Sequence, residues 1–372
     1  MNDNCCCHPS WLRAVTENGI VLLNYGNLEN LPTNRLCSKH RLLAKMFYVK
    51  RNRIKELPVD ISLQYPEITE IYLTSNQLCS LPQSIGDLIN LRNLDVCDNE
   101  LEYLPDSITT LGNLKQLRVR HNILKSLPYN IGNASSLEVL DASHNELRSV
   151  PCSIGNCKDI YQLLLSNNRL YSLPRQVCFL THLEQLSITS NCISNLPMDL
   201  GKHSTLSIIE MENNPLLHFC PSYFLSKYCH FDGCAQVEIG REHDFHDVTL
   251  AQITSRDSYT ISLPSHVKSY ASIKIVPSLM EITSRIVNFF SERQHLFISE
   301  NDLSGDIFDR LESPLGHCYY CSKPIFWSCY AVVNKASPCK LRHSMSIKNF
   351  YFLSYFCSPE CLLLHLFLQI DE

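Results

Sequence analysis

Residues 91–110 read LRNLDVCDNELEYLPDSITT, and this order of residue types returns along the chain every 23 residues. Apolar residues stand five and three places before an asparagine and two and five places after it, and a proline comes next. In this stretch the pattern is carried by Leu94, Val96, Asn99, Leu101 and Leu104-Pro105. The asparagine keeps its phase at Asn76, Asn99, Asn122, Asn145, Asn168, Asn191 and Asn214. A period of this length predicts a solenoid, in which each repeat covers its neighbour.

Each position of the repeat has a physical role. Apolar and polar residues alternate before the asparagine, which is typical of a short strand with one buried face, so Leu163 and Leu165 are predicted to point inward. A buried asparagine amide both donates and accepts, so it can bind the backbone where the chain turns. Proline in the Leu-Pro pair prevents a long helix on the return side, because it lacks an amide hydrogen. This pattern is identified as a leucine-rich repeat with a mostly irregular or 3₁₀ convex side.

The repeats extend beyond the regular asparagines. Asn52 begins the phase one unit earlier, and a still earlier unit has Gly26 in the asparagine place. The last coil ends at Cys220-Pro221 instead of Leu-Pro. Terminal repeats are expected to be atypical because one side has no neighbour. We therefore predict an α/β repeat solenoid, a leucine-rich repeat horseshoe of about nine coils, over residues 20–221.

Composition is that of an intracellular protein with room for a second domain. The 372 residues are 45% hydrophobic, and 32 Lys+Arg against 37 Asp+Glu give a net charge of -5, which offers no electrostatic reason to bind nucleic acid or an anionic membrane. The chain has 19 cysteines, but residues 1–11 contain no apolar signal segment, so reduced thiols in the cytoplasm or nucleus are the better interpretation.

Four cysteines near the C-terminus have the spacing of a metal site. Cys318 and Cys321 form C-x2-C, and Cys357 and Cys361 form C-x3-C. Two such pairs suit one tetrahedral structural zinc ion, since four thiolates leave no open position for catalysis. A turn at 322–324, a hairpin with strands over 325–333 and 350–356, and a helix from Cys361 are predicted around them. This order resembles a treble-clef zinc finger.

The sequence of this region is compatible with other interpretations. The cysteines could form a disulfide or remain in a free-thiol core, although spacing and redox compartment favour zinc. Residues 349–370 are apolar enough to resemble a membrane span, but Pro359, Glu360 and His365 would be costly there. Cys329, Cys339 and His317 are expected to be filler or outer residues around the site.

The repeats followed by Pro314-Leu315-Gly316-His317-Cys318-x-x-Cys321-Ser322-x-Pro324 and by Cys357-Ser358-x-x-Cys361 are similar to the leucine-rich repeat-containing protein 28 family. The similarity covers nearly the whole chain. It implies an intracellular interaction protein without enzyme activity. The family is expected to carry a close cysteine pair just after the repeats, whereas here Cys229 and Cys234 are separated by four residues.

The predicted organisation is a flexible tail over 1–19, repeats over 20–221, a connecting region over 222–312 with a helix near 278–290, and the zinc module over 313–372. A second metal site at Cys229, Cys234 and nearby histidines stays open, but their spacing favours a solvated loop. Acylation of Cys5-Cys6-Cys7 also stays open, although no myristoylation glycine or basic cluster supports it.

A binding surface follows from the strand register. Side chains pointing out of the strands line the concave face, where we predict partner binding by Tyr48, Tyr72, Asp95, Asp98, Arg118, Arg120, His121, Asp141 and His144. Tyrosine and arginine are frequent anchors of protein interfaces. The alternative is that opposite charges on adjacent strands pair with each other at little net energy.

Two classes of function remain. The favoured one is a non-enzymatic adaptor or scaffold that binds a protein partner, with one structural zinc, no nucleic acid and no membrane span. The other is a zinc-domain nucleic-acid reader or an enzyme. The chain lacks a phosphate loop, a dinucleotide fingerprint, a nucleophile elbow and an H-E-x-x-H motif, and its C-terminal charge is weak. Neither the partner nor the oligomeric state follows from the sequence.

Overall fold

A computed structural model of the chain describes residues 18–31, 38–217, 219–226, 228–230, 232–234, 245–251, 258–264, 267–268, 316–325, 329–335, 351–356 and 361. The chain divides into two compact units. The first comprises Met1–Asn191 and His203–Glu212, and the second comprises Cys192–Lys202 and Asn213–Glu372. The predicted helix near 278–290, the fourth cysteine Cys357, and Cys5, Cys6 and Cys7 lie outside the described residues.

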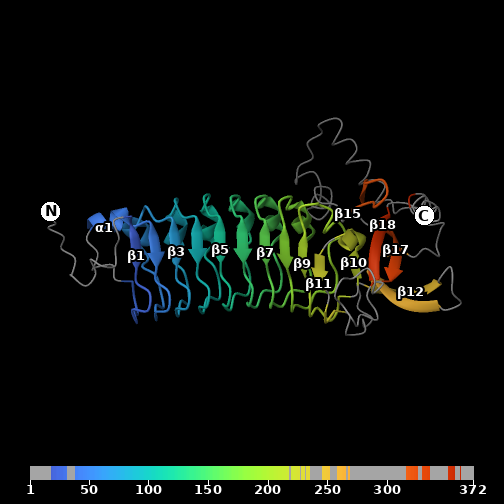
Figure 1. Ribbon diagram of the computed structural model, residues 1–372, viewed down its shortest axis with the longest axis horizontal. Coiled ribbons are helices and arrows are strands. Elements are labelled where there is room, and N and C mark those ends of the chain that lie inside the picture. The colour runs from blue at the N-terminus through green and yellow to red at the C-terminus, as the bar shows by residue number, and fades with distance from the viewer. Residues whose placement is uncertain are drawn as a thin grey trace, which may run out of the picture. The chain divides into compact units, whose positions relative to one another are not determined.

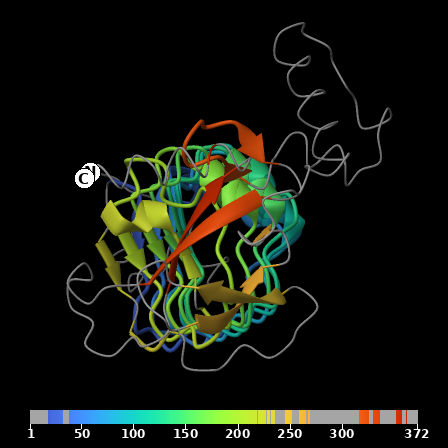
Figure 2. The same ribbon diagram turned by 90° about the vertical axis from the view of Figure 1, so that its right-hand side faces the viewer.

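The first unit is built on a parallel sheet of short strands that follow one another in chain order (Figure 1). Its strands are β1 (Ile20–Leu22), β2 (Met46–Tyr48), β3 (Glu70–Tyr72), β4 (Asn93–Asp95), β5 (Gln116–Arg118), β6 (Val139–Asp141), β7 (Gln162–Leu164), β8 (Gln185–Ser187) and β9 (Ile208–Glu210). Viewed along their stacking axis, the coils lie behind one another (Figure 2). This confirms the predicted repeat solenoid.

The return side of the coils carries short helices. These are α1 (Ser38–Leu43), α2 (Ile61–Gln64), η1 (Gln83–Asp87), η2 (Asp106–Thr110), η3 (Ile131–Asn133), η4 (Cys152–Asn156) and η5 (Arg175–Phe179). The 3₁₀ helices η1, η2 and η5 each begin directly after the proline of a Leu-Pro pair, and η4 begins after the proline of Val150-Pro151. Proline fixes the extended backbone before the turn, so the predicted 3₁₀ convex side is confirmed for these coils.

Leucines and asparagines hold neighbouring coils together. The middle residue of each strand is buried, for example Leu94, Leu117 and Leu163. The Asn99 Nδ2 donates to the Leu73 oxygen of the preceding coil at 3.1 Å and to the Val96 oxygen of its own coil at 3.0 Å. Its Oδ1 accepts the N–H of Leu78 at 3.0 Å. The same bonds recur at Asn122, Asn145, Asn168 and Asn191.

The second unit contains a four-stranded sheet in the order β10 (Phe219–Pro221), β18 (Tyr351–Phe356), β17 (Cys329–Lys335) and β14 (Val267–Lys268). It also contains η6 (Ser222–Ser226), β11 (Tyr228–His230), the antiparallel pair β12 (Phe245–Ala251) and β13 (Ser258–Pro264), and the pair β15 (Gly316–His317) and β16 (Pro324–Ile325). The predicted returning strand at 350–356 is found as β18. Of the predicted first strand at 325–333, Ile325 belongs to β16 and the residues from Cys329 onward belong to β17, which pairs with β18, while residues 326–328 lie outside the described residues.

Candidate functional site

The open face of the sheet, defined as the face away from the coil interior, carries the side chains predicted to bind a partner. The third residues of β2 to β6 stand beside one another in strand register, in the order Tyr48, Tyr72, Asp95, Arg118 and Asp141. Asp141 is buried and the other four are half-buried. Side chains from five separate coils therefore form one continuous row.

The amino end of the row is aromatic and ordered. The rings of Tyr48 and Tyr72 stack with centroids 4.8 Å apart and an interplanar angle of 13°. The Lys50 Nζ lies 4.8 Å from the centroid of the Tyr72 ring and 4.0 Å from the Asp95 Oδ2. Burial, and then the hydrogen bond from the Tyr72 hydroxyl to Glu70, raises the pKa of Tyr72 to about 12. This hydroxyl stays protonated at neutral pH, and it can serve a partner as a neutral polar group.

The acidic and basic members of the row form no ion pair with one another within the described residues. The Oδ1 atoms of Asp95 and Asp141 each accept the N–H of the residue two places further on, at 3.1 Å, so both carboxylates close the turn after their strand. Arg118 stands between them in register. Within the described part of the chain, the ion pairs shorter than 4.0 Å include neither Arg118 nor Arg120. The alternative that adjacent strands simply pair their charges is therefore not observed at these arginines.

Asp98, His121 and His144 do not lie within strands. They belong to a set of residues that immediately precede the ladder asparagines and have φ between 53° and 59°: Arg51, Ser75, Asp98, His121, His144, Asn167, Ser190 and Asn213. Asparagine, aspartate and histidine are enriched at positive φ, so the backbone corner alone accounts for several of these residue types. Sequence reasoning missed this, although the series of small polar residues and histidines before the asparagine is a readable signal.

The corner nevertheless brings two imidazoles together. The rings of His121 and His144 stack with centroids 4.0 Å apart, and the Nδ2 of Asn167 lies 3.3 Å from the His144 Nε2. Burial, followed by the charges of His121 and Arg120, lowers the pKa of His144.

Three of the four predicted metal ligands lie together. The Sγ atoms of Cys318, Cys321 and Cys361 are all within 4.8 Å of one another. Sulfurs sharing a tetrahedral zinc are about 3.8 Å apart, since each Zn–S bond is about 2.3 Å, so these three cysteines are close enough to hold one metal ion. The turn after Cys318 has the form of a knuckle: the N–H of Cys318 donates to the Lys323 oxygen, and the N–H of Ser322 donates to the Cys318 oxygen, both at 2.9 Å.

His317, predicted to be an outer residue, is held by an aspartate far away in the sequence. Its N–H donates to the Asp199 Oδ1 at 2.9 Å, and its Nδ1 lies 2.5 Å from the Asp199 Oδ2. Gly316 packs against Met198 so closely that an added Cβ would lie 2.6 Å from the Met198 Cβ. Asp199 therefore positions the strand that leads into Cys318.

These observations define a leucine-rich repeat solenoid, and its second unit carries three cysteines that are close enough to hold a metal ion. Residues 61–150 match a family model described as a leucine-rich repeat region, so the chain carries such a region. Among the described residues, no helix is long and apolar enough to span a membrane.

Several solved leucine-rich repeat structures are similar to the chain. The ectodomain of the plant membrane receptor kinase GASSHO1/SCHENGEN3 from Arabidopsis thaliana, in complex with CASPARIAN STRIP INTEGRITY FACTOR 2, is 22% identical with a TM-score of 0.46; the match covers 52% of this chain and 24% of the receptor. The LRIM1/APL1C complex is 20% identical over 56% of this chain and 38% of its own, with a TM-score of 0.48. A leucine-rich repeat protein of Leptospira interrogans is 22% identical over 60% of this chain and 75% of its own, with a TM-score of 0.37.

Proposed function

We propose that this chain is a non-enzymatic intracellular adaptor or scaffold that binds a protein partner on the open face of strands β2 to β6. The observation that carries the proposal is the row in which stacked Tyr48 and Tyr72 are followed by the arginine of β5, which forms no ion pair within the described residues. Buried aromatic rings and arginines contribute most of the energy in many protein interfaces. The repeated strands present them in a fixed geometry, so little side-chain entropy is lost on binding.

We further propose that Cys318, Cys321, Cys357 and Cys361 hold one structural zinc. The three described thiols support this assignment because they lie close enough to share an ion. Zinc would crosslink the knuckle to the segment around Cys361, and four thiolates would leave no position for a substrate. The similarity to the leucine-rich repeat-containing protein 28 family also favours an adaptor of the cytoplasm, with the nucleus as a second compartment.

The decisive experiment for partner binding compares interactors of the intact chain with those of an Arg118→Glu, Arg120→Glu variant, by affinity enrichment from cells and quantitative mass spectrometry. The variant reverses the charge of Arg118 within the row and of Arg120, two residues further on. The recovered amount of one or a few partners should fall by about tenfold or more, because rim contacts alone contribute little. Thermal unfolding of the variant should match the wild type, since Arg118 is half-buried and Arg120 is exposed.

A matched control is Arg53→Glu, Arg148→Glu, which makes the same charge change at exposed residues beyond the ladder asparagines. This control should keep the partner list of the wild type. Identical lists for all three proteins would contradict partner binding on the open face.

A further inference from the structure

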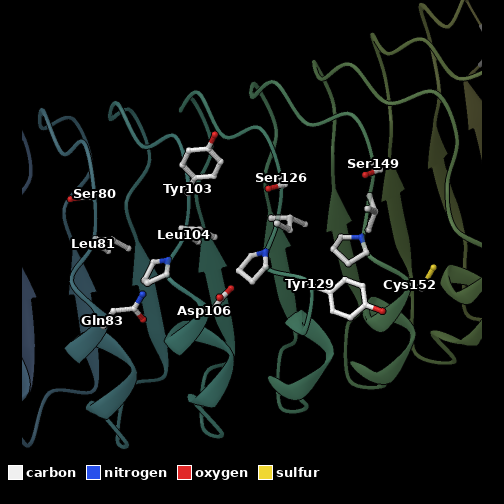
Figure 3. Close-up of a pocket in the computed structure, with 15 residues that line it drawn as sticks. Ser80, Leu81, Gln83, Tyr103, Leu104, Asp106, Ser126, Tyr129, Ser149 and Cys152 are labelled. Carbon is white, nitrogen blue, oxygen red and sulfur yellow. The ribbon is translucent and has the colours of Figure 1, made fainter.

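A second surface lies on the segments that connect each strand to the short helix of the return side, away from the open face. A groove of about 870 Å³ crosses the Leu-Pro turns of four successive coils (Figure 3). Its floor consists of the buried residues Leu81, Leu104, Leu127 and Val150 and the prolines that follow three of them. Sequence reasoning used the Leu-Pro pairs only as helix breakers and did not anticipate a groove.

One border of the groove is a column of hydroxyl groups. The residue before each Leu-Pro or Val-Pro pair is Ser80, Tyr103, Ser126 or Ser149, and every one of them is exposed. Figure 3 shows these four side chains along one side of the groove. Ser80, Ser126 and Ser149 occupy the same place in their coils and present equivalent hydroxyls, with Ser80 and Ser126 two coils apart, whereas the longer Tyr103 side chain carries its hydroxyl further out (Figure 3).

The other border holds Gln83, Asp106, Tyr129 and Cys152 (Figure 3). Tyr103 and Tyr129 therefore flank the floor from opposite sides, and they are 57% and 78% exposed. Exposed tyrosines beside an apolar floor are typical of recognition surfaces, because each ring adds a large contact area and a polar tip.

The charge of the groove limits what can occupy it. Asp106 is the only ionisable carboxylate among the lining residues, and the lining contains no lysine or arginine. Asp106 is exposed, and the ion pairs found within the described ranges do not include it. The Lys125 Nζ lies 5.6 Å from the centroid of the Tyr103 ring at the border, but it is already paired with Glu102 at 2.8 Å. A segment with one basic residue would find a carboxylate.

The spacing of the hydroxyls suits a polyproline II helix. Such a helix has no internal hydrogen bonds, so its carbonyls are free to accept, and it advances about 9.3 Å per three-residue turn. Parallel strands are about 4.8 Å apart, so every second coil returns after about 9.6 Å. Tyrosine-lined grooves bind proline-rich segments in other folds through this combination of ring contacts and donors.

We propose that the Leu-Pro groove binds a proline-rich segment of a partner protein in the polyproline II conformation, with a lysine or arginine of that segment against Asp106. The segment's proline rings lie on the floor between Tyr103 and Tyr129, and its carbonyls accept from the hydroxyl column. This site is independent of the open face, so the chain can hold two segments at once.

The test uses the full chain and three fluorescein-labelled synthetic peptides: a nine-proline peptide ending in arginine, the same peptide ending in glutamate, and a glycine-serine peptide ending in arginine. Fluorescence anisotropy should show binding of the first peptide, about tenfold weaker binding of the second because of repulsion by Asp106, and no saturable binding of the third. Absence of binding by the first peptide, or equal binding of the glycine-serine peptide, would overturn the proposal.

Variants locate the site. Tyr103→Ala and Tyr129→Ala should each weaken the arginine-tipped peptide by about tenfold, and Asp106→Asn should abolish the difference between the arginine and glutamate peptides. Tyr171→Ala is the matched control, because Tyr171 is 60% exposed on a neighbouring coil but does not line the groove. Equal losses in Tyr171→Ala and Tyr129→Ala would overturn the assignment. So would a wild-type dimer in sedimentation that Tyr129→Ala dissolves, since a second copy would then cover the groove.

Discussion

The repeat coils and the cysteine knuckle differ in how their folded structures are stabilised. In the coils every neighbour repeats the same buried leucine and the same asparagine bonds, so many similar contacts share the stabilisation. In the knuckle, three thiols from two distant parts of the sequence converge on one point. A solenoid is therefore expected to tolerate a local change, whereas a metal-centred module depends on one ion.

Redundancy in the coils is visible at single atoms. The Val119 oxygen accepts from Asn122 of its own coil and from Asn145 of the next coil, at 3.0 Å in both cases. The Ala142 oxygen is shared in the same way by Asn145 and Asn168. Removing Asn145 therefore leaves both of these carbonyls with another asparagine donor.

Removal of the proposed zinc should produce the largest effect. Structural zinc in small modules contributes about 10–16 kcal/mol of apparent binding free energy, so a chelator under reducing conditions should unfold the knuckle. Hydrogen exchange measured by mass spectrometry on the full chain should show loss of protection in residues 316–325 and 351–356. Protection in the strands from β4 to β8 should not change, because their core contains no proposed metal ligand.

Cysteine variants sharpen this contrast. Cys321→Ser and Cys361→Ser should each abolish the stoichiometric zinc measured by plasma mass spectrometry, while Cys97→Ser, a half-buried cysteine of the repeats, should retain it. A chain that is purified without zinc, or a Cys361→Ser variant that retains zinc, would contradict the four-thiolate zinc site. These cysteines would then be ordinary core residues.

A cavity in the middle of the solenoid should cost less than loss of the metal. Leu165 is fully buried, so Leu165→Ala should lower the free energy of unfolding by roughly 2–5 kcal/mol. The neighbouring Leu164 is only half-buried on the open face, and Leu164→Ala should cost less than about 1 kcal/mol. Urea unfolding of the two variants measures the difference, and equal midpoints would show that the inward and outward positions are misassigned.

The sequence predicts most of the coil architecture because each coil is specified locally. Leu163 and Leu165 are buried and Gln162 is half-buried, as the alternation indicates. The terminal deviation was also readable: Gly26 lacks an amide side chain, and its N–H donates to the Asn52 Oδ1 of the next coil at 2.9 Å. A pattern repeated many times leaves few alternative registers.

Features that depend on distant segments could not be predicted. No local pattern relates Asp199 to His317, which are 118 positions apart. The Leu-Pro groove depends on four coils lying side by side. The hydroxyl-bearing residues of these coils form one border only because the coils are stacked. His121 and His144 were predicted to bind a partner, but both have positive φ. Histidine is enriched at positive φ, so the backbone conformation by itself can explain a histidine at these two positions.

A break in the asparagine ladder should have an intermediate effect that tests redundancy. Asn145→Ala leaves the N–H of Leu124 without its acceptor, while the Val119 and Ala142 oxygens keep other asparagines. We expect a loss of about 1–3 kcal/mol in the free energy of unfolding, the cost of one buried unsatisfied group. The exposed Asn156→Ala is the control and should have little effect. A loss of free energy of unfolding well above that of Leu165→Ala would mean that the neighbouring asparagines do not compensate for the missing one.

The smallest expected effect is the pH response of the histidine corner. The pKa of His144 in the folded chain lies below its ordinary value of 6.5, because of burial and then the charges of His121 and Arg120. As the pH falls below about 6.5, His144 is therefore protonated in the unfolded chain before it is protonated in the folded chain. This lowers the free energy of unfolding, and the loss continues until the pH has dropped through the pKa of His144 in the folded chain. Thermal unfolding between pH 8 and pH 5 should show a slightly smaller decrease in Tm for His144→Asn than for the wild type.

Asparagine is the suitable replacement for His144 because it tolerates positive φ, as Asn167 does in the next coil. His121→Asn should give an intermediate slope, since it removes one of the two charges but not the burial. Parallel curves for all three proteins would show that the stacked imidazoles do not influence each other's protonation, and the corner would then be explained by its backbone conformation alone.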